Sequence, residues 1–81
     1  MMNFEFFATD KKITRVLFCK AGWFHDTYLG DVSLILHPEF MIPSVGDCVT
    51  LWNPAENDYH VYRVIHRWIH YKEGQIEIRV K

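Results

Sequence analysis

Three histidines near the end of the chain are the first residues whose types and spacing invite a chemical role. His60, His66 and His70 stand at even positions of a segment rich in β-branched and aromatic residues, so on a strand they would share one face. Imidazole binds zinc, but an extended strand would separate His60 from His70 by ~33 Å. On a helix, Arg67 would stand where a zinc protease carries its glutamate. The spacing predicts ordinary histidines, with no metal and no other cofactor.

The two cysteines are the next candidates for chemistry. Cys19 and Cys48 lie in separate strand-like segments and form no Cys-x-x-Cys pair. Nucleophilic catalysis needs a cysteine or serine beside a histidine and an orienting acid, and no spacing in the chain supports that arrangement. We expect two reduced thiols buried as packing residues, and no catalytic residues.

Aromatic residues in an irregular stretch offer a binding surface. Trp23, Phe24 and Tyr28 stand among turn-forming residues without a regular period, and aromatic side chains on loops are frequent anchors of protein interfaces. This interpretation predicts a protein partner or self-association. In the alternative, the rings fold back over the open end of a small barrel and belong to the core, because a short domain needs every large ring it has.

Basic and stacking side chains gather in the last third of the chain. They are Arg63, Arg67, Trp68 and Tyr71. Such residues on a β surface are the ingredients of single-stranded nucleic-acid recognition. The formal net charge of -1 argues against that function. Cross-strand ion pairs of the two arginines with Glu73 and Glu77 are the alternative role.

Length and composition limit the architecture. A chain of 81 residues has room for one domain and one hydrophobic core, which we place at residues 1–81. Apolar residues make up 49% of the chain, which is far from the composition of disordered segments. No stretch approaches the roughly 20 apolar residues of a membrane span, and no basic leader precedes an apolar run. We expect a cytoplasmic domain that binds no membrane.

Alternating segments bounded by turn residues predict five or six short strands. They are residues 3–7, 13–20, 31–37, 48–52, 59–71 and 75–80. The first two should form a hairpin. Turns are expected at residues 43–47, 53–58 and 72–74, and a loop at residues 21–30.

Residues 54–71 admit a second interpretation. Asn53 as N-cap, Pro54 at the first position and Gly74 as a stop would fit a helix, which would make the domain α+β. Residues 59–71 are nevertheless almost all β-branched, aromatic or basic, with no Ala, Leu or Glu. We therefore favour an all-β fold, a small barrel with tight turns.

Three motifs in the second half of the chain carry a resemblance. They read IPSVGDCV at residues 42–49, YHVYRVIH at residues 59–66 and IEIRV at residues 76–80. This series resembles the Pro-x-x-Gly-Asp-x-Val, Tyr-x-Val-x-x-Val and alternating final strand of small bacterial SH3-like β-barrel proteins, a largely uncharacterised group. The resemblance implies an SH3-like barrel. Residues 21–41 depart from the pattern because they are longer and more aromatic.

Function does not follow from such a fold. With a neutral balance of charge, no catalytic spacing and an aromatic loop, the sequence predicts a noncatalytic protein-interaction or accessory module. A barrel that binds single-stranded nucleic acid is the alternative.

Overall fold

The computed structural model describes residues 11–81, in which five strands form one sheet. The strands are β1 (Arg15–Lys20), β2 (Thr27–Ser33), β3 (Cys48–Asn53), β4 (Asp58–His70) and β5 (Gln75–Val80). Their order in the sheet is β2-β1-β5-β4-β3. No helix occurs in this part of the chain, so the all-β prediction is confirmed and the helical alternative for residues 54–71 is excluded.

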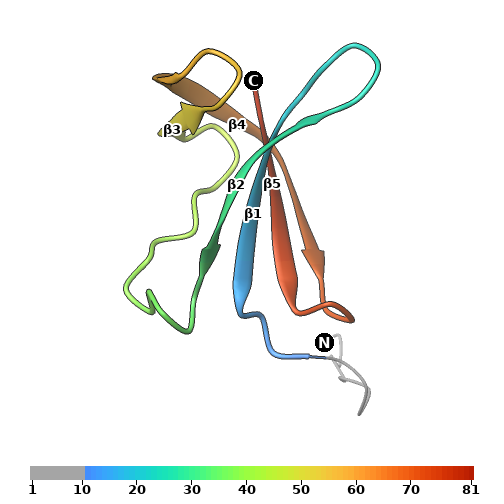
Figure 1. Ribbon diagram of the computed structural model, residues 1–81. Helices are drawn as coiled ribbons and strands as arrows, with labels where there is room; N and C mark the ends of the chain where they lie inside the picture. The colour runs from blue at the N-terminus through green and yellow to red at the C-terminus, as the bar shows by residue number, and fades with distance from the viewer. Residues whose placement is uncertain (1–10) are drawn as a thin grey trace.

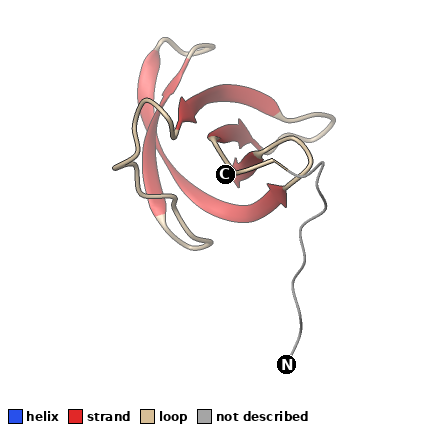
Figure 2. Ribbon diagram, turned by 90° about the horizontal axis from the view of Figure 1, so that it is seen from below, coloured by secondary structure: helices blue, strands red, loops and turns tan. Residues whose placement is uncertain are grey.

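The sheet curls on itself into a half-barrel (Figure 2). β1 and β5 are parallel, and every other neighbouring pair is antiparallel. The long strand β4 pairs with two neighbours along its length. Its first half pairs with β3 and its second half with β5 (Figure 1). The two edge strands, β2 and β3, flank the open side of the half-barrel, which we call the seam.

The hydrophobic core lies on the inner face of the curled sheet. Its buried residues are Val16, Phe18, Tyr62, Val64, Ile76, Ile78 and Val80. β5 alternates strictly between half-buried and buried positions, as its sequence predicts. The parallel register sets Val16 beside Ile76 and Phe18 beside Ile78. The central pair of strands therefore supplies most of the core.

The segments on either side of β2 differ from the predicted ones. The expected loop at residues 21–30 is shorter, because β2 begins at Thr27 and pairs with β1. The expected strand at residues 31–37 stops at Ser33, where the chain turns. There the N–H of His37 donates to the carbonyl of Ser33 at 2.9 Å, and the N–H of Leu36 donates to the Ser33 hydroxyl at 3.3 Å. The predicted strand 3–7 and its hairpin lie outside the described residues.

A β-bulge in β4 changes which residues face the core. The register shifts between Val64 and His66, which leaves Ile65 without a partner on β5. Before the bulge, even positions such as Val64 point inward. After it, Arg67 lies opposite the fully buried Ile78, so odd positions take the inner face.

Candidate interaction surface

The loop between β1 and β2, residues 21–26, holds two aromatic rings in solvent. Trp23 and Phe24 are each 99% exposed. The alternative in which they cover the open end of the barrel is therefore wrong for these two residues. Tyr28, the third predicted binding residue, lies in β2 rather than in the loop and is 53% exposed.

An ion pair fixes the end of this loop to the centre of the sheet. Oδ2 of Asp26 accepts a hydrogen bond from Nε of Arg79 at 2.8 Å and lies 2.6 Å from Nη2 of the same guanidinium. Both side chains are partly buried, with 27% and 34% of their surface exposed. A contact between one carboxylate and two guanidinium nitrogens fixes orientation as well as distance. β5 thus holds a loop that lies 53 residues earlier in the chain.

Aromatic rings extend this contact across the outer face of the sheet. The guanidinium of Arg79 lies 5.1 Å from the ring centroid of Trp68, a cation–π contact. The Trp68 ring stacks in turn on His66, with 4.2 Å between centroids. Asp26 therefore ends a row of packed side chains rather than making an isolated surface contact.

The start of the loop is equally constrained. The N–H of Ala21 donates to the carbonyl of Val80 at 2.8 Å. At Gly22, any Cβ would collide with the carbonyl oxygen of His25. The backbone turns back on itself so tightly here that only glycine fits. Trp23 and Phe24 consequently project from a short loop with both ends tied to β5.

The bulge separates the four residues of the nucleic-acid hypothesis. Arg63 precedes the bulge and is exposed opposite Cys48, whereas Arg67 follows it and takes the inner face. Trp68 lies on the outer face, and Tyr71 belongs to the turn after β4. The structure does not bring these side chains onto one surface.

The predicted ion pairs of the two arginines with Glu73 and Glu77 are wrong. Within residues 11–81, the ion pairs join Arg15 to Asp31, His37 to Glu39, His60 to Glu56 and Arg79 to Asp26. Glu77 lies opposite Trp68 in the β4–β5 ladder. The same bulge explains this outcome, because Arg67 points to the opposite face from Glu77.

The three histidines do not share a face either. His60 lies on the inner side of β4, between the buried Tyr62 and the hairpin turn, whereas His66 and His70 follow the bulge on the outer side. In residues 11–81, no three histidine, cysteine or acidic side chains gather into a possible metal site.

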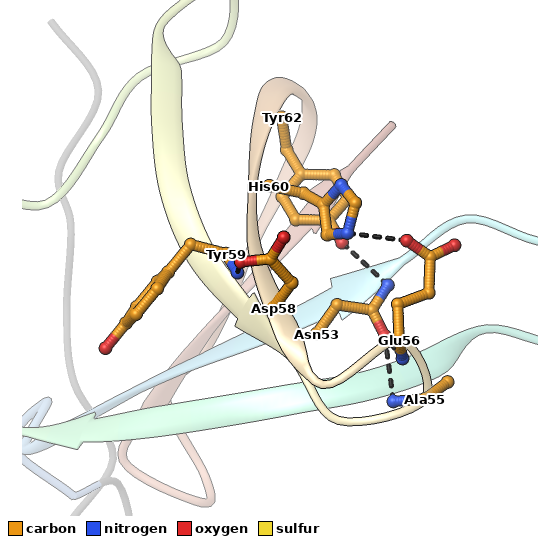
Figure 3. Close-up of polar contacts among 7 residues, drawn as sticks. All are labelled: Asn53, Ala55, Glu56, Asp58, Tyr59, His60 and Tyr62. Atoms are coloured by element: carbon orange, nitrogen blue, oxygen red, sulfur yellow. Dashed lines mark hydrogen bonds and ion pairs between the residues drawn. The ribbon is translucent and has the colours of Figure 1, made fainter.

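His60 instead belongs to a polar cluster at the β3–β4 hairpin (Figure 3). Its Nε2 atom lies 2.5 Å from Oε2 of Glu56. Beside it, the buried Asn53 donates from Nδ2 to the Tyr62 hydroxyl at 2.9 Å and accepts at Oδ1 from the N–H of Ala55 at 2.9 Å. The hydrogen bonds of Asn53 thus close the turn, and His60 meets Glu56 beside them as an ion pair.

The two cysteines differ in their surroundings. Both thiols are free; Cys19 is half-buried and Cys48 is exposed, so the prediction of two buried thiols is wrong for Cys48. Burial raises the pKa of the Cys19 thiol, and the carboxylates of Glu77 and Asp26 raise it further. Cys48 lies on an edge strand with its side chain on the outer face, where nothing buries it.

An apolar groove of about 410 Å³ opens at the seam. Its walls come from β2, from β3 and from the long loop that connects them, together with Phe18 of β1. The lining residues are Phe18, Leu29, Gly30, Asp31, Val32, Phe40, Met41, Pro43, Val49, Thr50 and Leu51. This groove was not predicted from the sequence. Its one local signal is the apolar run at residues 40–43, which stands in a connecting segment where polar residues are usual.

A second exposed apolar area was also missed. Trp52 and Tyr59 lie opposite each other on the outer face of the β3–β4 hairpin, with ring centroids 5.0 Å apart, and Val61 continues this face. All three are exposed. The signal was available, because both odd and even positions of residues 48–52 carry apolar or weakly polar side chains.

No family model, curated protein or solved structure shows a significant match to this chain. The resemblance to SH3-like barrel proteins therefore stays a prediction. Within residues 11–81 there is no helix that is long and apolar enough to cross a membrane.

Proposed function

We propose that this domain is a noncatalytic protein-interaction module that binds its partner through Trp23 and Phe24. The exposure of both rings, 99% each, carries the proposal. Apolar surface removed from water contributes roughly 25 cal/mol per Å². The two rings are not buried in the isolated chain, so their burial against a partner would stabilise the complex. Binding hot spots are enriched in such large, rigid aromatic side chains.

The fixed base of the loop supports the same function. Contacts of Asp26 with Arg79 and of Ala21 with Val80 hold both ends of residues 21–26. A recognition loop that is ordered before binding loses less conformational entropy when the partner arrives. Tyr28, half-exposed on β2, extends the proposed contact from the loop to the sheet.

A protein partner is favoured over a nucleic acid. The net charge of -1 provides no general attraction to phosphates. Arg63 and Arg67, which would have to contact one strand of nucleic acid together, point to opposite faces of β4.

The test compares two double variants that each remove two exposed apolar side chains. Trp23→Ala/Phe24→Ala removes the proposed anchors, and Ile35→Ala/Leu36→Ala removes two apolar side chains that are 73% and 75% exposed in the β2–β3 loop. We expect circular dichroism to show that both variants fold as the original chain does. Light scattering and capture from native cell extract should then show loss of association for the first variant alone.

Two results would contradict the proposal. One is unchanged association of the Trp23→Ala/Phe24→Ala variant. The other is its unfolding, which would assign the two rings to the core.

A further inference from the structure

We infer that the partner of the Trp23–Phe24 loop is a second copy of this chain, whose groove at the seam receives the two rings. The inference rests on the proposed function and names its partner. One molecule carries both parts of such a contact: two rings in solvent on the β1–β2 loop, and an apolar groove at the seam. Figure 1 shows that the β1–β2 loop extends beyond one end of the half-barrel. Each of two copies can therefore insert its Trp23–Phe24 loop into the groove of the other.

The groove has the size and chemistry of a site for apolar rings. Its volume of about 410 Å³ lies within the ~300–1,000 Å³ range of pockets that enclose small organic ligands. Leu29, Phe40 and Leu51 form its walls and are only partly buried in the isolated chain. Entry of an indole and a phenyl ring would complete the burial of these walls.

The two strand edges beside the groove offer a second kind of contact. β2 and β3 end the sheet, and in residues 11–81 neither pairs with a further strand along its outer edge. Their unpaired backbone N–H and C=O groups are available to the main chain of an inserted loop. Edge hydrogen bonds would fix the direction in which the loop enters.

The area that such an exchange buries favours two reciprocal insertions over a single one. Each aromatic side chain buries about 150–250 Å², so the four rings of two insertions bury about 800 Å². With the groove walls that cover them, the total reaches about 1,000 Å², the lower limit for a specific protein–protein interface. A single insertion would bury about half of that, which is typical of crystal-packing contacts.

Reciprocal insertion also limits the assembly to two copies. When each chain gives one loop and receives one, the contact obeys a two-fold axis and leaves no loop or groove free. Head-to-tail insertion would leave both free at the ends and would build open chains.

The test is sedimentation velocity on the full chain at concentrations from about 5 to 500 μM. We expect a monomer–dimer equilibrium. Trp23→Ala/Phe24→Ala and Met41→Glu should each raise the dimer Kd at least about thirtyfold, the effect of losing one hot spot. Met41 lines the groove but is 87% exposed, so a charge there blocks the groove and spares the fold.

The matched control is Leu36→Glu. It places the same charge in the same β2–β3 loop at a side chain that is 75% exposed and outside the groove. This variant should leave the dimer Kd unchanged. An equimolar mixture of the Trp23→Ala/Phe24→Ala and Met41→Glu chains should form a mixed dimer more readily than either chain pairs with itself, because one intact loop then meets one intact groove.

Each opposing result has a distinct meaning. Three results would overturn the inference. The chain could be monomeric at every concentration, it could form open polymers, or its Met41→Glu variant could have the same dimer Kd as Leu36→Glu. If such a monomeric chain still captures another protein through Trp23 and Phe24, the proposed function stands without the dimer. If neither association depends on the two rings, both proposals fall.

Discussion

Asn53 is the one buried polar side chain among the described residues, and it closes the β3–β4 hairpin from within. Its amide donates to Tyr62 and accepts from the backbone of the turn. A buried polar group of this kind holds its neighbours in one arrangement. Any of its partners that lost the hydrogen bond would be buried away from water with no replacement bond, which costs free energy. By comparison, the exposed pair of Arg15 and Asp31 contributes little to stability.

Asn53→Ala should lower the free energy of unfolding by about 1–3 kcal/mol, because it leaves the Tyr62 hydroxyl and a turn N–H without partners. Tyr62→Phe removes only one of these hydrogen bonds and should lower it by about 1 kcal/mol. Urea denaturation of both variants measures the difference. Equal losses would mean that the turn contacts of Asn53 contribute nothing.

The two thiols should react at different rates. Because the pKa of Cys19 is raised above its ordinary value of 9.0, less thiolate is present at a given pH, and alkylation of Cys19 should lag behind that of the exposed Cys48 at pH 8. The lag should shrink as the pH rises through the Cys19 pKa. Mass spectrometry after timed iodoacetamide treatment, with Cys48→Ser as the control, measures both rates. Equal rates at pH 8 would contradict the burial of Cys19.

The same shift has a consequence for stability. An unfolded chain ionises this thiol at its ordinary pKa, whereas the folded chain keeps it neutral to higher pH. Ionisation therefore favours the unfolded state once the pH exceeds about 9. Cys19→Ala should flatten the decline in stability over that range.

Among the elements, β4 shows how a single unpaired residue divides a strand into two surfaces. Ile65 shifts the register so that Val64 and Arg67, three positions apart, both face inward. The second half of the strand can then place Ile69 opposite the buried Ile76 while the first half keeps Tyr62 in the core. The sheet bends at this point to form the curl.

Deletion of Ile65 should lower the free energy of unfolding by about 1–3 kcal/mol. The deletion removes the unpaired residue, so Val64 still lies opposite Val80 and His66 opposite Arg79, and both halves of β4 keep their faces. What the variant loses is the bend that the bulge gives to the strand. Ile65→Ala keeps the bulge and should lose only about 1 kcal/mol, since the side chain is half-exposed. Thermal and urea unfolding distinguish the two. Similar stability of both variants would mean that the bend contributes nothing to stability.

Local patterns were sufficient for the second half of the fold. Alternation in residues 75–80 and β-branched composition in residues 59–71 predict β5 and β4 almost to the residue, because these strands pair with near neighbours through short turns. β2 was misplaced because its pairing with β1 contains an irregularity at Phe18 and includes Gly30, a residue that reads as a turn. Its bounds depend on the partner strand rather than on its own composition.

The candidate site was predictable only in part. The sequence identifies Trp23 and Phe24 as loop residues, but their exposure depends on Asp26 reaching Arg79 from 53 positions away. The faces of Arg67 and His66 depend on a bulge that no alternation reveals. The groove forms between two strands that do not pair with each other, so the apolar run at residues 40–43 is a local signal of it but does not predict where its walls lie.

At the scale of the whole molecule, charge is nearly balanced, with nine basic and ten acidic residues. We expect fluorescence anisotropy to detect no salt-sensitive binding of a mixed single-stranded oligonucleotide, because few phosphates could be neutralised by one continuous surface. Arg63→Ala and Arg67→Ala should leave that result unchanged. Binding that weakens steeply between low and physiological salt would restore the nucleic-acid alternative.

The central place of β5 has a consequence for how the molecule is made. β5 is the last of the five strands in chain order, yet it separates β1 from β4, and Arg15 pairs with Gln75, which lies 60 positions later in the chain. During translation β1 and β2 leave the ribosome first. At that time β5, which pairs with the other edge of β1, has not been synthesised. Until Gln75–Val80 emerges, Val16 and Phe18 stay open to chaperones and to aggregation, so the closing step of folding falls at the end of translation of this domain.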